Sequence, residues 1–363
     1  MEDQQYMELA LNLARAVKGQ TSPNPPVGAV LVKEGEIVGL GAHLKSGEAH
    51  AEVHALEMAG EKAKEAVLYV TLEPCCHVGK TPACTSAIIQ SGVRRVVVAT
   101  EDLHEKVAGQ GIALLRRSGI EVTVGVCEAE ARELLEEFFH YMTKGLPFVT
   151  MKVATSLDGK IATYTGESQW ITGEEARLDV HRERHIHDAI LVGVQTVIAD
   201  DPSLTTRLPS GGKNPLRVVL DTNLRTPTDA KLVRDGEGPT VIFVGNGVKE
   251  ERLELFTAFS QVEIIKAETK RVSPRFVLEE LAKRGVMSIF VEGGATVNDS
   301  FLQEGLVDQL LLYMAPKLIG GKEAPTAIGG AGFASLQEAA ALEITSVKRI
   351  GVDVKITAKR RQE

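Results

Sequence analysis

Patterns typical of buried strands alternate with patterns typical of helices along almost the whole chain, and this alternation restricts the fold more than any other feature. The apolar runs "AVLYVTL" (66–72) and "RRVVVAT" (94–100) are separated by the helical segment "CTSAIIQSG" (84–92). A chain of this kind forms a parallel or mixed sheet that is covered by helices. The predicted fold class is therefore α/β.

The rest of the first 145 residues follows the same pattern. A further helix and strand are expected in "GIALLRRSG" and "EVTVGV", and a long helical stretch then runs through "EARELLEEFFHYM". Nearer the N-terminus we expect, in chain order, a helix over 5–18, a hairpin of two strands over 27–32 and 36–43, and a helix over 49–63.

The helical pattern ends at "TKGLPF" (143–148), because Gly145 and Pro147 break a helix. At 363 residues the chain is also longer than one typical domain. We therefore expect two α/β domains, 1–144 and 145–363. Strands and helices alternate again in the second domain, and the tail (342–360) has the alternation of a closing antiparallel hairpin.

Composition excludes some classes of function. The chain is 44% apolar and 25% charged, as in ordinary globular proteins, and its net charge is −8. A general nucleic-acid binder needs a basic surface, whereas one small phosphorylated molecule needs only a local cluster of Arg and Lys. No apolar run of about 18 residues is present, and the N-terminus starts with acids rather than a basic secretion signal. We expect a cytoplasmic protein that binds neither membranes nor nucleic acids.

Three of the four cysteines lie within ten residues, downstream of the motif His50-Ala51-Glu52. In a reducing compartment such a cluster indicates metal binding or catalysis. The imidazole of His50 and the thiolates of Cys75 and Cys84 suit zinc and leave a fourth position for water. Zinc lowers the pKa of that water, and the resulting hydroxide can attack a ring carbon that bears an amino group. Glu52 would carry the proton from water to the ring and to the departing ammonia.

Two simpler interpretations compete with this one. His50 and Glu52 could be an ordinary pair on a helix surface, and the cysteines could be buried fillers. Alternatively the zinc site could be closed and structural, with Cys76 or His77 as the fourth ligand, so that Glu52 has no role. Structural zinc sites favour short C-x-x-C pairs, which are absent here.

The combination of H-A-E with a later P-C after an apolar strand resembles the cytidine-deaminase superfamily. Here eight residues separate Cys75 from Cys84, where that superfamily usually has P-C-x-x-C. With this spacing, "TLEPCCHVGKTPAC" and "TSPNPPVGAVLV" resemble the bifunctional deaminase/reductase family of riboflavin biosynthesis, and the resemblance covers essentially the whole chain. It implies an N-terminal cytidine-deaminase-like α/β/α sandwich and a C-terminal dihydrofolate-reductase-like α/β domain.

The resemblance also implies a two-step activity. A zinc-dependent deaminase would hydrolyse 2,5-diamino-6-ribosylamino-4(3H)-pyrimidinone 5′-phosphate, and an NADPH-dependent reductase would then convert the ribosyl group to ribityl. The product would be 5-amino-6-ribitylamino-uracil 5′-phosphate. The family's features fall on the zinc ligands His50, Cys75 and Cys84, the proton carrier Glu52, and the substrate-binding residues Asn24, His43 and Lys80.

The deaminase half departs from the family at two places. Ala83 stands where T-P-P-C is common, which should matter little. The second departure is the replacement of a D-P-N-P stretch by Asp102-Leu103-His104-Glu105. The asparagine of that stretch contacts substrate in the family, and His104 is our candidate for a similar hydrogen bond.

In the second domain no G-x-G-x-x-G follows a strand, so no Rossmann site is predicted. In "SIFVEGGATVNDSF" a buried strand ends at Gly293-Gly294 and a helix begins at once. Backbone N–H groups at such a helix start can bind phosphate, although a tight turn is the alternative. We expect the glycine-rich segment 329–335 to be a loop.

The segments "MKVATSLDGKIA", "GESQWIT", "LVGVQTVIADDPSLTTR" and "RVVLDT" resemble the reductase half of the same family. Lys152 and Glu292 are our candidates for managing the proton that accompanies hydride transfer. By the resemblance, NADPH would contact Ala154, Trp170, Thr196, Asp200, Thr222, Gly294, Ala295, Thr296, Val297, Asn298, Asp299 and Ser300, and substrate would contact Ser168, Arg184, Leu204, Arg207 and Glu292.

Three other functions fit the sequence less well. A nucleic-acid base deaminase would need a basic, aromatic-lined groove, but only 4% of the residues are aromatic and the chain is acidic. A binding protein with a structural zinc would not need Glu52, which is present. A nucleotide sensor that uses the second domain has no motif in its favour. The family resemblance further suggests a homo-oligomer.

Overall fold

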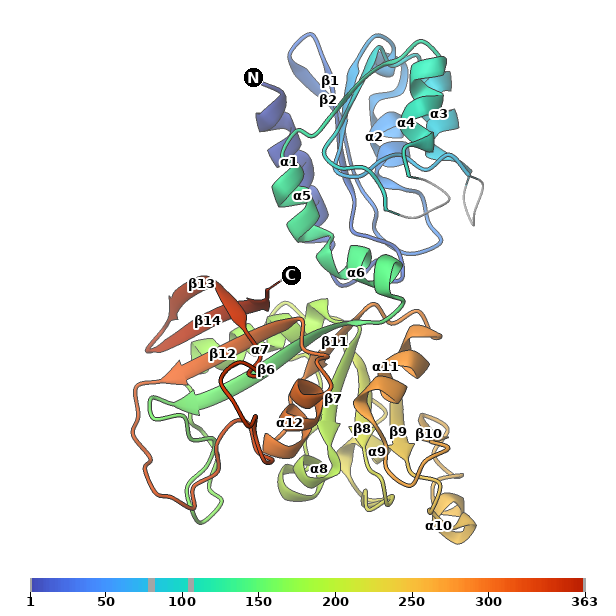
Figure 1. The fold of residues 1–363 in the computed structure, drawn as a ribbon. Helices are drawn as coiled ribbons and strands as arrows, with labels where there is room; N and C mark the ends of the chain where they lie inside the picture. The colour runs from blue at the N-terminus through green and yellow to red at the C-terminus, as the bar shows by residue number, and fades with distance from the viewer. Residues whose placement is uncertain (1, 78–81, 104–107, 362–363) are drawn as a thin grey trace. The chain divides into compact units, whose positions relative to one another are not determined.

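The computed structural model describes residues 2–77, 82–103 and 108–361. The chain divides into two compact units, Met1–Leu146 and Pro147–Glu363 (Figure 1). No helix in the described part of the chain is both long and apolar enough to cross a membrane.

Unit 1 is built on a five-stranded mixed sheet with the strand order β2-β1-β3-β4-β5. Strand β1 pairs antiparallel with β2 and with β3, whereas β3, β4 and β5 run parallel. The expected hairpin and mixed sheet are therefore confirmed. The strands are β1 (Gly28–Lys33), β2 (Glu36–Ala42), β3 (Val67–Val70), β4 (Arg95–Val98) and β5 (Glu121–Val124).

Helices cover both faces of this sheet, which makes the expected α/β/α sandwich (Figure 1). One face carries α1 and α5, and the other carries α2, α3 and α4. Close packing of α2 depends on Gly41 of β2, because a Cβ there would lie 1.9 Å from the carbonyl oxygen of Ala51. The helices are α1 (Asp3–Ala16), α2 (Ala51–Ala59), α3 (Cys84–Ser91), α4 (Gln110–Arg117), α5 (Glu128–Leu134) and α6 (Glu136–Lys144), and a 3₁₀ turn covers Gly60–Ala63.

The prediction of one long helix through 130–142 was wrong. The chain forms two helices, α5 and α6, with Leu135 between them at φ −97° and ψ 10°. Leu135 is fully buried, so the apolar periodicity continues across the break although the helix axis changes. A hydrophobic pattern cannot reveal a bend of this kind, since both helices bury the same side chains.

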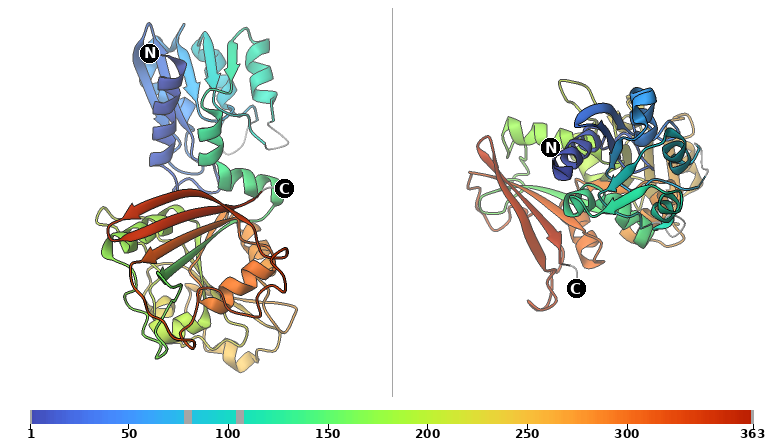
Figure 2. Two further views of the ribbon diagram at one scale, coloured as in Figure 1. Left: turned by 60° about the vertical axis from the view of Figure 1, so that its left-hand side comes forward. Right: turned by 90° about the horizontal axis from the view of Figure 1, so that it is seen from above.

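Unit 2 contains a nine-stranded sheet with the order β10-β9-β8-β7-β11-β6-β12-β14-β13. The first seven strands in this order are parallel, and the hairpin β13–β14 adds to the edge next to β12 (Figure 2). The strands are β6 (Phe148–Ser156), β7 (Ala189–Gly193), β8 (Leu216–Leu220), β9 (Thr240–Val244), β10 (Val262–Lys266), β11 (Ser288–Val291), β12 (Gln309–Ala315), β13 (Leu342–Ile350) and β14 (Asp353–Arg360).

The parallel arrangement brings the carboxyl ends of β6, β7, β8 and β11 to one edge of the sheet, where ligands bind in open α/β folds. The expected C-terminal hairpin is confirmed, whereas β10 and the short helices α8 to α10 were not predicted, because each is brief or polar. The helices are α7 (Glu174–Ile186), α8 (Val194–Asp200), α9 (Lys231–Arg234), α10 (Glu250–Glu254), α11 (Pro274–Ala282) and α12 (Ala295–Gln303). Segment 329–335 is a loop, as expected.

Candidate active sites

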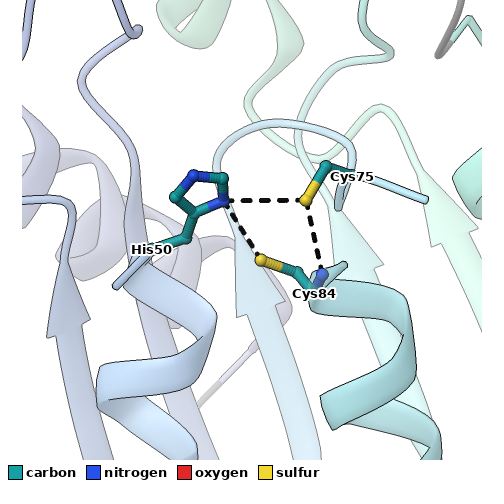
Figure 3. Close-up of side chains that lie close together, drawn as sticks. All are labelled: His50, Cys75 and Cys84. Carbon is teal, nitrogen blue, oxygen red and sulfur yellow. Dashed lines mark hydrogen bonds between the residues drawn. The ribbon is translucent and has the colours of Figure 1, made fainter. Parts of the chain in front are cut away.

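Two helix starts and the loop after β3 bring His50, Cys75 and Cys84 together in unit 1 (Figure 3). His50 is the N-cap residue of α2, and Cys84 is the first residue of α3. Cys75 lies between them, in the loop that the buried strand β3 delivers to the same place. His50 and Cys84 therefore lie at the starts of the helices that were expected over 49–63 and 84–92.

The three side chains have the geometry of a metal site. The Nδ1 atom of His50 lies 3.2 Å from the sulfur of Cys84 and 3.6 Å from that of Cys75. The potential ligand atoms all lie within 4.8 Å of one another, and the backbone N–H of Cys84 donates to the sulfur of Cys75 at 3.3 Å. One imidazole and two thiolates form a donor set that zinc prefers. Neither Cys76 nor His77, the candidates for a fourth ligand, belongs to this group of described residues.

Electrostatics at the cluster favour a thiolate. Hydrogen bonding from Cys84, against the opposing effect of burial, and a further hydrogen bond with His50 lower the pKa of Cys75 to about 4. The hydrogen bond with Cys75 in turn raises the pKa of His50. A low thiol pKa is a property of reactive and metal-binding cysteines rather than of buried fillers.

Glu52 lies in the first turn of α2, two residues from His50, and only 4% of it is exposed. Burial raises the pKa of its carboxyl group to about 7, and Cys75 contributes in the same direction. A carboxyl group with a pKa near 7 can both accept and donate a proton at neutral pH.

His43 and Asn24 form a pair beside the cluster. The Nδ1–H of His43 donates to the carbonyl oxygen of Ala49 at 3.1 Å, which leaves Nε2 to accept from the Nδ2 of Asn24 at 3.0 Å. Burial lowers the pKa of His43, so the ring is neutral. Its ring also lies edge-on to that of His50, with 5.0 Å between the centroids.

One cavity of about 390 Å³, a size that suits a small-molecule ligand, is lined by Asn24, His43, His50, Glu52 and Cys75. Sequence reasoning missed part of its wall. Phe138 lies in the helical stretch expected through 130–142, but nothing in the sequence related it to this cavity. Lys80 and His104 lie outside the described residues. The missed lining residues include Ser46, Glu73, Asp102, Phe138 and Met142.

In unit 2, a buried carboxylate joins two cations. Glu292 follows β11 directly, and its Oε1 accepts from the Nε of Arg184 on α7 at 2.6 Å. Its Oε2 accepts from the Nζ of Lys152 on β6 at 3.4 Å. Burial by itself would raise the pKa of Glu292, but Arg184 and Lys152 outweigh it and lower the pKa to about 2.

A second arginine lies near this cluster. The backbone N–H of Arg207 donates to the Nδ1 of His181 at 3.3 Å. Burial, together with the charges of Arg184 and Arg207, lowers the pKa of His181 to about 4. The predicted substrate residue Leu204 is buried at φ +54°, next to Thr205, whose carbonyl accepts from Arg184 at 3.0 Å. Two neighbouring arginines, of which Arg184 is oriented by Glu292, form a suitable site for a phosphate group.

The start of α12 provides a phosphate-sized cradle. Gly293 allows a close approach, because a Cβ there would lie 2.6 Å from the side chain of Val297, whereas a Cβ on Gly294 would meet nothing within 4 Å. The first N–H groups of a helix have no intrahelical acceptor and favour anions. Asn298 is buried, and its amide donates to the carbonyl of Ala327 at 2.8 Å, so this side chain orders the neighbouring loop.

The other residues predicted to bind the cofactor lie around the same edge of the sheet. Thr196 and Asp200 are on α8, which follows β7, and Thr222 follows β8. Ala154 lies within β6. In the loop after β6, Ser168 is partly buried, and Trp170 is 61% exposed with the guanidinium of Arg177 4.9 Å from its ring centroid.

Two family models match the chain, one in each unit. Residues 1–100 match the model of the cytidine and deoxycytidylate deaminase zinc-binding region. Residues 147–356 match the model of the RibD C-terminal domain. The two matches correspond to the two units of the structure.

Similarity to individual proteins extends over the whole chain. The riboflavin biosynthesis protein RibD of Bacillus amyloliquefaciens is 51% identical over 356 residues, covering 98% of this chain and 96% of that protein. The structure of RibD from Acinetobacter baumannii has 38% identity and a TM-score of 0.89, with 99% of both chains covered. A Thermotoga maritima diaminohydroxyphosphoribosylaminopyrimidine deaminase/5-amino-6-(5-phosphoribosylamino)uracil reductase has 35% identity and the same TM-score and coverage. This chain therefore belongs to the RibD family, the bifunctional deaminases and reductases of riboflavin biosynthesis.

Proposed function

We propose that this chain catalyses two consecutive steps of riboflavin synthesis, with residues 1–144 as the deaminase domain and 145–363 as the reductase domain. The first step hydrolyses 2,5-diamino-6-ribosylamino-4(3H)-pyrimidinone 5′-phosphate. The second reduces its ribosyl group with NADPH to give 5-amino-6-ribitylamino-uracil 5′-phosphate. The observation that carries the proposal is the position of buried Glu52 beside three metal-ligating side chains in a cavity of about 390 Å³.

In the deaminase, His50, Cys75 and Cys84 hold one zinc ion per chain through Nδ1 and two sulfurs. The donor types and their separations of at most 4.8 Å fit this ion. When bound, zinc acts as a Lewis acid that makes water acidic enough to react near neutral pH. Three protein ligands leave one tetrahedral position accessible from the cavity.

Glu52 manages the protons of the hydrolysis. Its carboxylate takes one proton from water and passes it to the ring nitrogen, and then takes the remaining proton of that water and passes it to the leaving amino group. The C–N bond to the amino group is broken, a C–O bond from water is formed, and ammonia departs. A pKa of about 7 suits a group that must do both.

Substrate recognition in the deaminase falls to Asn24 and His43, with Lys80 and His104 completing the site. Because His43 is held neutral with Nδ1–H bound to Ala49, the Asn24 amide and the edge of the His43 ring present fixed polar groups to a pyrimidine. A lysine such as Lys80 supplies a positive charge for the ribose phosphate.

In the reductase, residues along the carboxyl edge of the sheet would hold NADPH, which would supply a hydride. The ionised Glu292 orients Arg184 and Lys152, and Lys152 manages the proton. The glycine cradle at the start of α12 fits a cofactor phosphate. Cofactor contacts are assigned to Ala154, Trp170, Thr196, Asp200, Thr222 and Gly294 to Ser300, and substrate contacts to Ser168, Arg184, Leu204, Arg207 and Glu292.

The proposed protein is cytoplasmic and forms a homo-oligomer. Zinc binding requires reduced Cys75 and Cys84, a condition that the cytoplasm maintains. A homo-oligomer is supported by exposed apolar side chains on the edge strand β13, where Ile344 and Val347 are 61% and 62% exposed. Light scattering on the purified chain tests the oligomeric state.

The central test pairs metal content with ammonia release. Glu52→Gln should keep one zinc per chain and lower kcat for ammonia release by about a thousand-fold, the scale of general acid–base catalysis. Glu57→Gln, an exposed site on the same helix, is the matched control and should keep wild-type activity. A Glu52→Gln enzyme with full zinc and full activity would show that another group carries the proton.

A further inference from the structure

The carboxylate of Glu73 accepts four backbone hydrogen bonds at the wall of the deaminase cavity. Glu73 follows β3 and immediately precedes Pro74-Cys75, and only 4% of it is exposed. Its own backbone N–H donates to the carbonyl oxygen of Thr100 at 3.0 Å, which extends the pairing of β3 with β4. The side chain therefore starts from a rigid position next to a zinc ligand.

Its two oxygens serve different parts of the chain after β4. Oε2 accepts from the N–H of Asp102 at 3.2 Å and from that of Gly109 at 2.9 Å. Oε1 accepts from Gly111 at 2.8 Å and Ile112 at 3.1 Å, in the first turn of α4. One carboxylate thus holds the backbone N–H groups of Asp102 and Gly109 and also caps the first turn of α4.

Gly111 provides separate evidence that this contact is built into the fold. A Cβ at Gly111 would lie 2.2 Å from the carbonyl oxygen of Pro74 and 3.1 Å from Oε1 of Glu73. Only glycine lets the first turn of α4 come this close to the loop that carries Cys75. The start of α4 is consequently fixed relative to the loop that carries the zinc ligand Cys75.

The backbone that Glu73 holds reaches the wall of the deaminase cavity at Asp102. Asp102 lines the cavity and is 9% exposed, and Glu73 lines it as well.

We propose that Glu73 is a positioning residue of the deaminase, which sets the place of Asp102 and of the start of α4 at the wall of the cavity that binds the pyrimidine. This inference rests on the proposed deaminase function. Glu73 neither ligates the metal nor moves a proton. Glutamine has nearly the same shape, but its NH₂ group would face two backbone N–H donors, so two of the four bonds would be lost.

The test uses the full chain, whose reductase serves as an internal control. Glu73→Gln should raise KM for the diaminopyrimidine ribosyl phosphate about ten-fold and change kcat by less than about three-fold. Zinc content and reductase activity should stay at wild-type levels. Glu101→Gln, an exposed glutamate next to Asp102, is the matched control and should leave KM unchanged.

Gly111→Ala is the second variant, because its Cβ would push α4 away from Pro74 while the Glu73 carboxylate is kept. It should also raise KM for the deaminase substrate. If Glu73→Gln does not fold, the KM of Gly111→Ala tests the proposal. An unchanged KM in the soluble variants would overturn the proposal, and so would loss of zinc together with activity, which would make Glu73 a support of the metal loop. Wild-type protein that releases no ammonia from this substrate would instead refute the proposed function itself.

Discussion

Glu52 in unit 1 and Glu292 in unit 2 are glutamates with little exposed surface, 4% of Glu52 and 11% of the Glu292 side chain, yet their surroundings shift their pKa values in opposite directions. Burial raises the pKa of Glu52 to about 7, and the neighbouring Cys75 adds to the effect. Burial acts on Glu292 too, but Arg184 and Lys152 reverse it and bring the pKa to about 2. The comparison shows that the charges around a buried carboxyl group, and not its burial alone, decide whether it can exchange protons.

The two clusters also differ in whether they require a bound metal ion. The metal-ligating group of unit 1 combines two sulfurs and one imidazole, and this donor set suits zinc. In unit 2, Glu292 already lies between Lys152 and Arg184. We therefore expect metal removal to inactivate the first site and leave the second intact.

The largest effect should follow removal of a metal ligand. Cys84→Ala leaves two of three protein ligands, so zinc content should fall towards zero and ammonia release should fall at least about a thousand-fold. Reductase activity, assayed with the deaminated substrate, should stay within about two-fold. Metal analysis and the two assays on one preparation measure all three quantities.

Cys127→Ala is the control for that experiment, since Cys127 lies at the start of α5 and outside the metal-ligating group. It should keep both zinc and activity. Equal loss of both activities in Cys84→Ala would mean that the two clusters are not independent. It would contradict the expectation that only the deaminase requires the metal.

A smaller effect is expected from Glu292→Gln, which leaves Arg184 and Lys152 without their anion. Loss of one partner of a buried ion cluster costs about 3 kcal/mol of unfolding free energy, and reductase kcat/KM should fall about a hundred-fold. Urea unfolding can be followed by the fluorescence of Trp170, the single tryptophan of the chain. Exposed Glu279→Gln is the control and should change stability by less than about 0.5 kcal/mol.

The stability difference between wild type and Glu292→Gln should depend on pH with a defined sign. The pKa of Glu292 falls from an ordinary 4.5 to about 2 on folding, so the unfolded chain binds this proton first as pH decreases. Its contribution is complete above pH 4.5 and is lost progressively as pH falls towards 2. The difference should be constant from about pH 7 to 5 and shrink below that; a decline already between those values would contradict the assignment.

The smallest effect concerns substrate recognition in unit 1. Asn24→Ala removes the amide that donates to Nε2 of His43 at 3.0 Å and a polar group of the cavity wall. A hydrogen bond of this kind is worth about 1 kcal/mol, so KM for the deaminase substrate should rise about five- to ten-fold with zinc unchanged. Asn12→Ala, at an exposed position, should leave KM at the wild-type value. An equal change of KM in both variants would show that Asn24 does not bind the substrate.

Much of unit 1 could be predicted because its elements carry local signals. His50 and Cys84 begin helices that are recognisable from periodicity, and a buried apolar strand delivers Cys75 between them. Their side chains meet because neighbouring elements of a mixed sheet end at the same edge. Phe138 and Met142 also reach this cavity, but they come from α6, after a bend at Leu135 that no periodic pattern reveals.

The sequence by itself determined the α/β class, the metal-ligating residue types and the family, because strand and helix periodicity and donor chemistry are properties of neighbouring residues. Only the tertiary structure decided that Nδ1 of His50 faces both sulfurs, that Glu73 ties the segment after β4 to the metal loop, and that Glu52 and Glu292 have opposite pKa shifts. Each of these depends on distances of a few ångströms between atoms that are far apart in the chain, and hydrogen bonds and charge interactions change steeply over such distances.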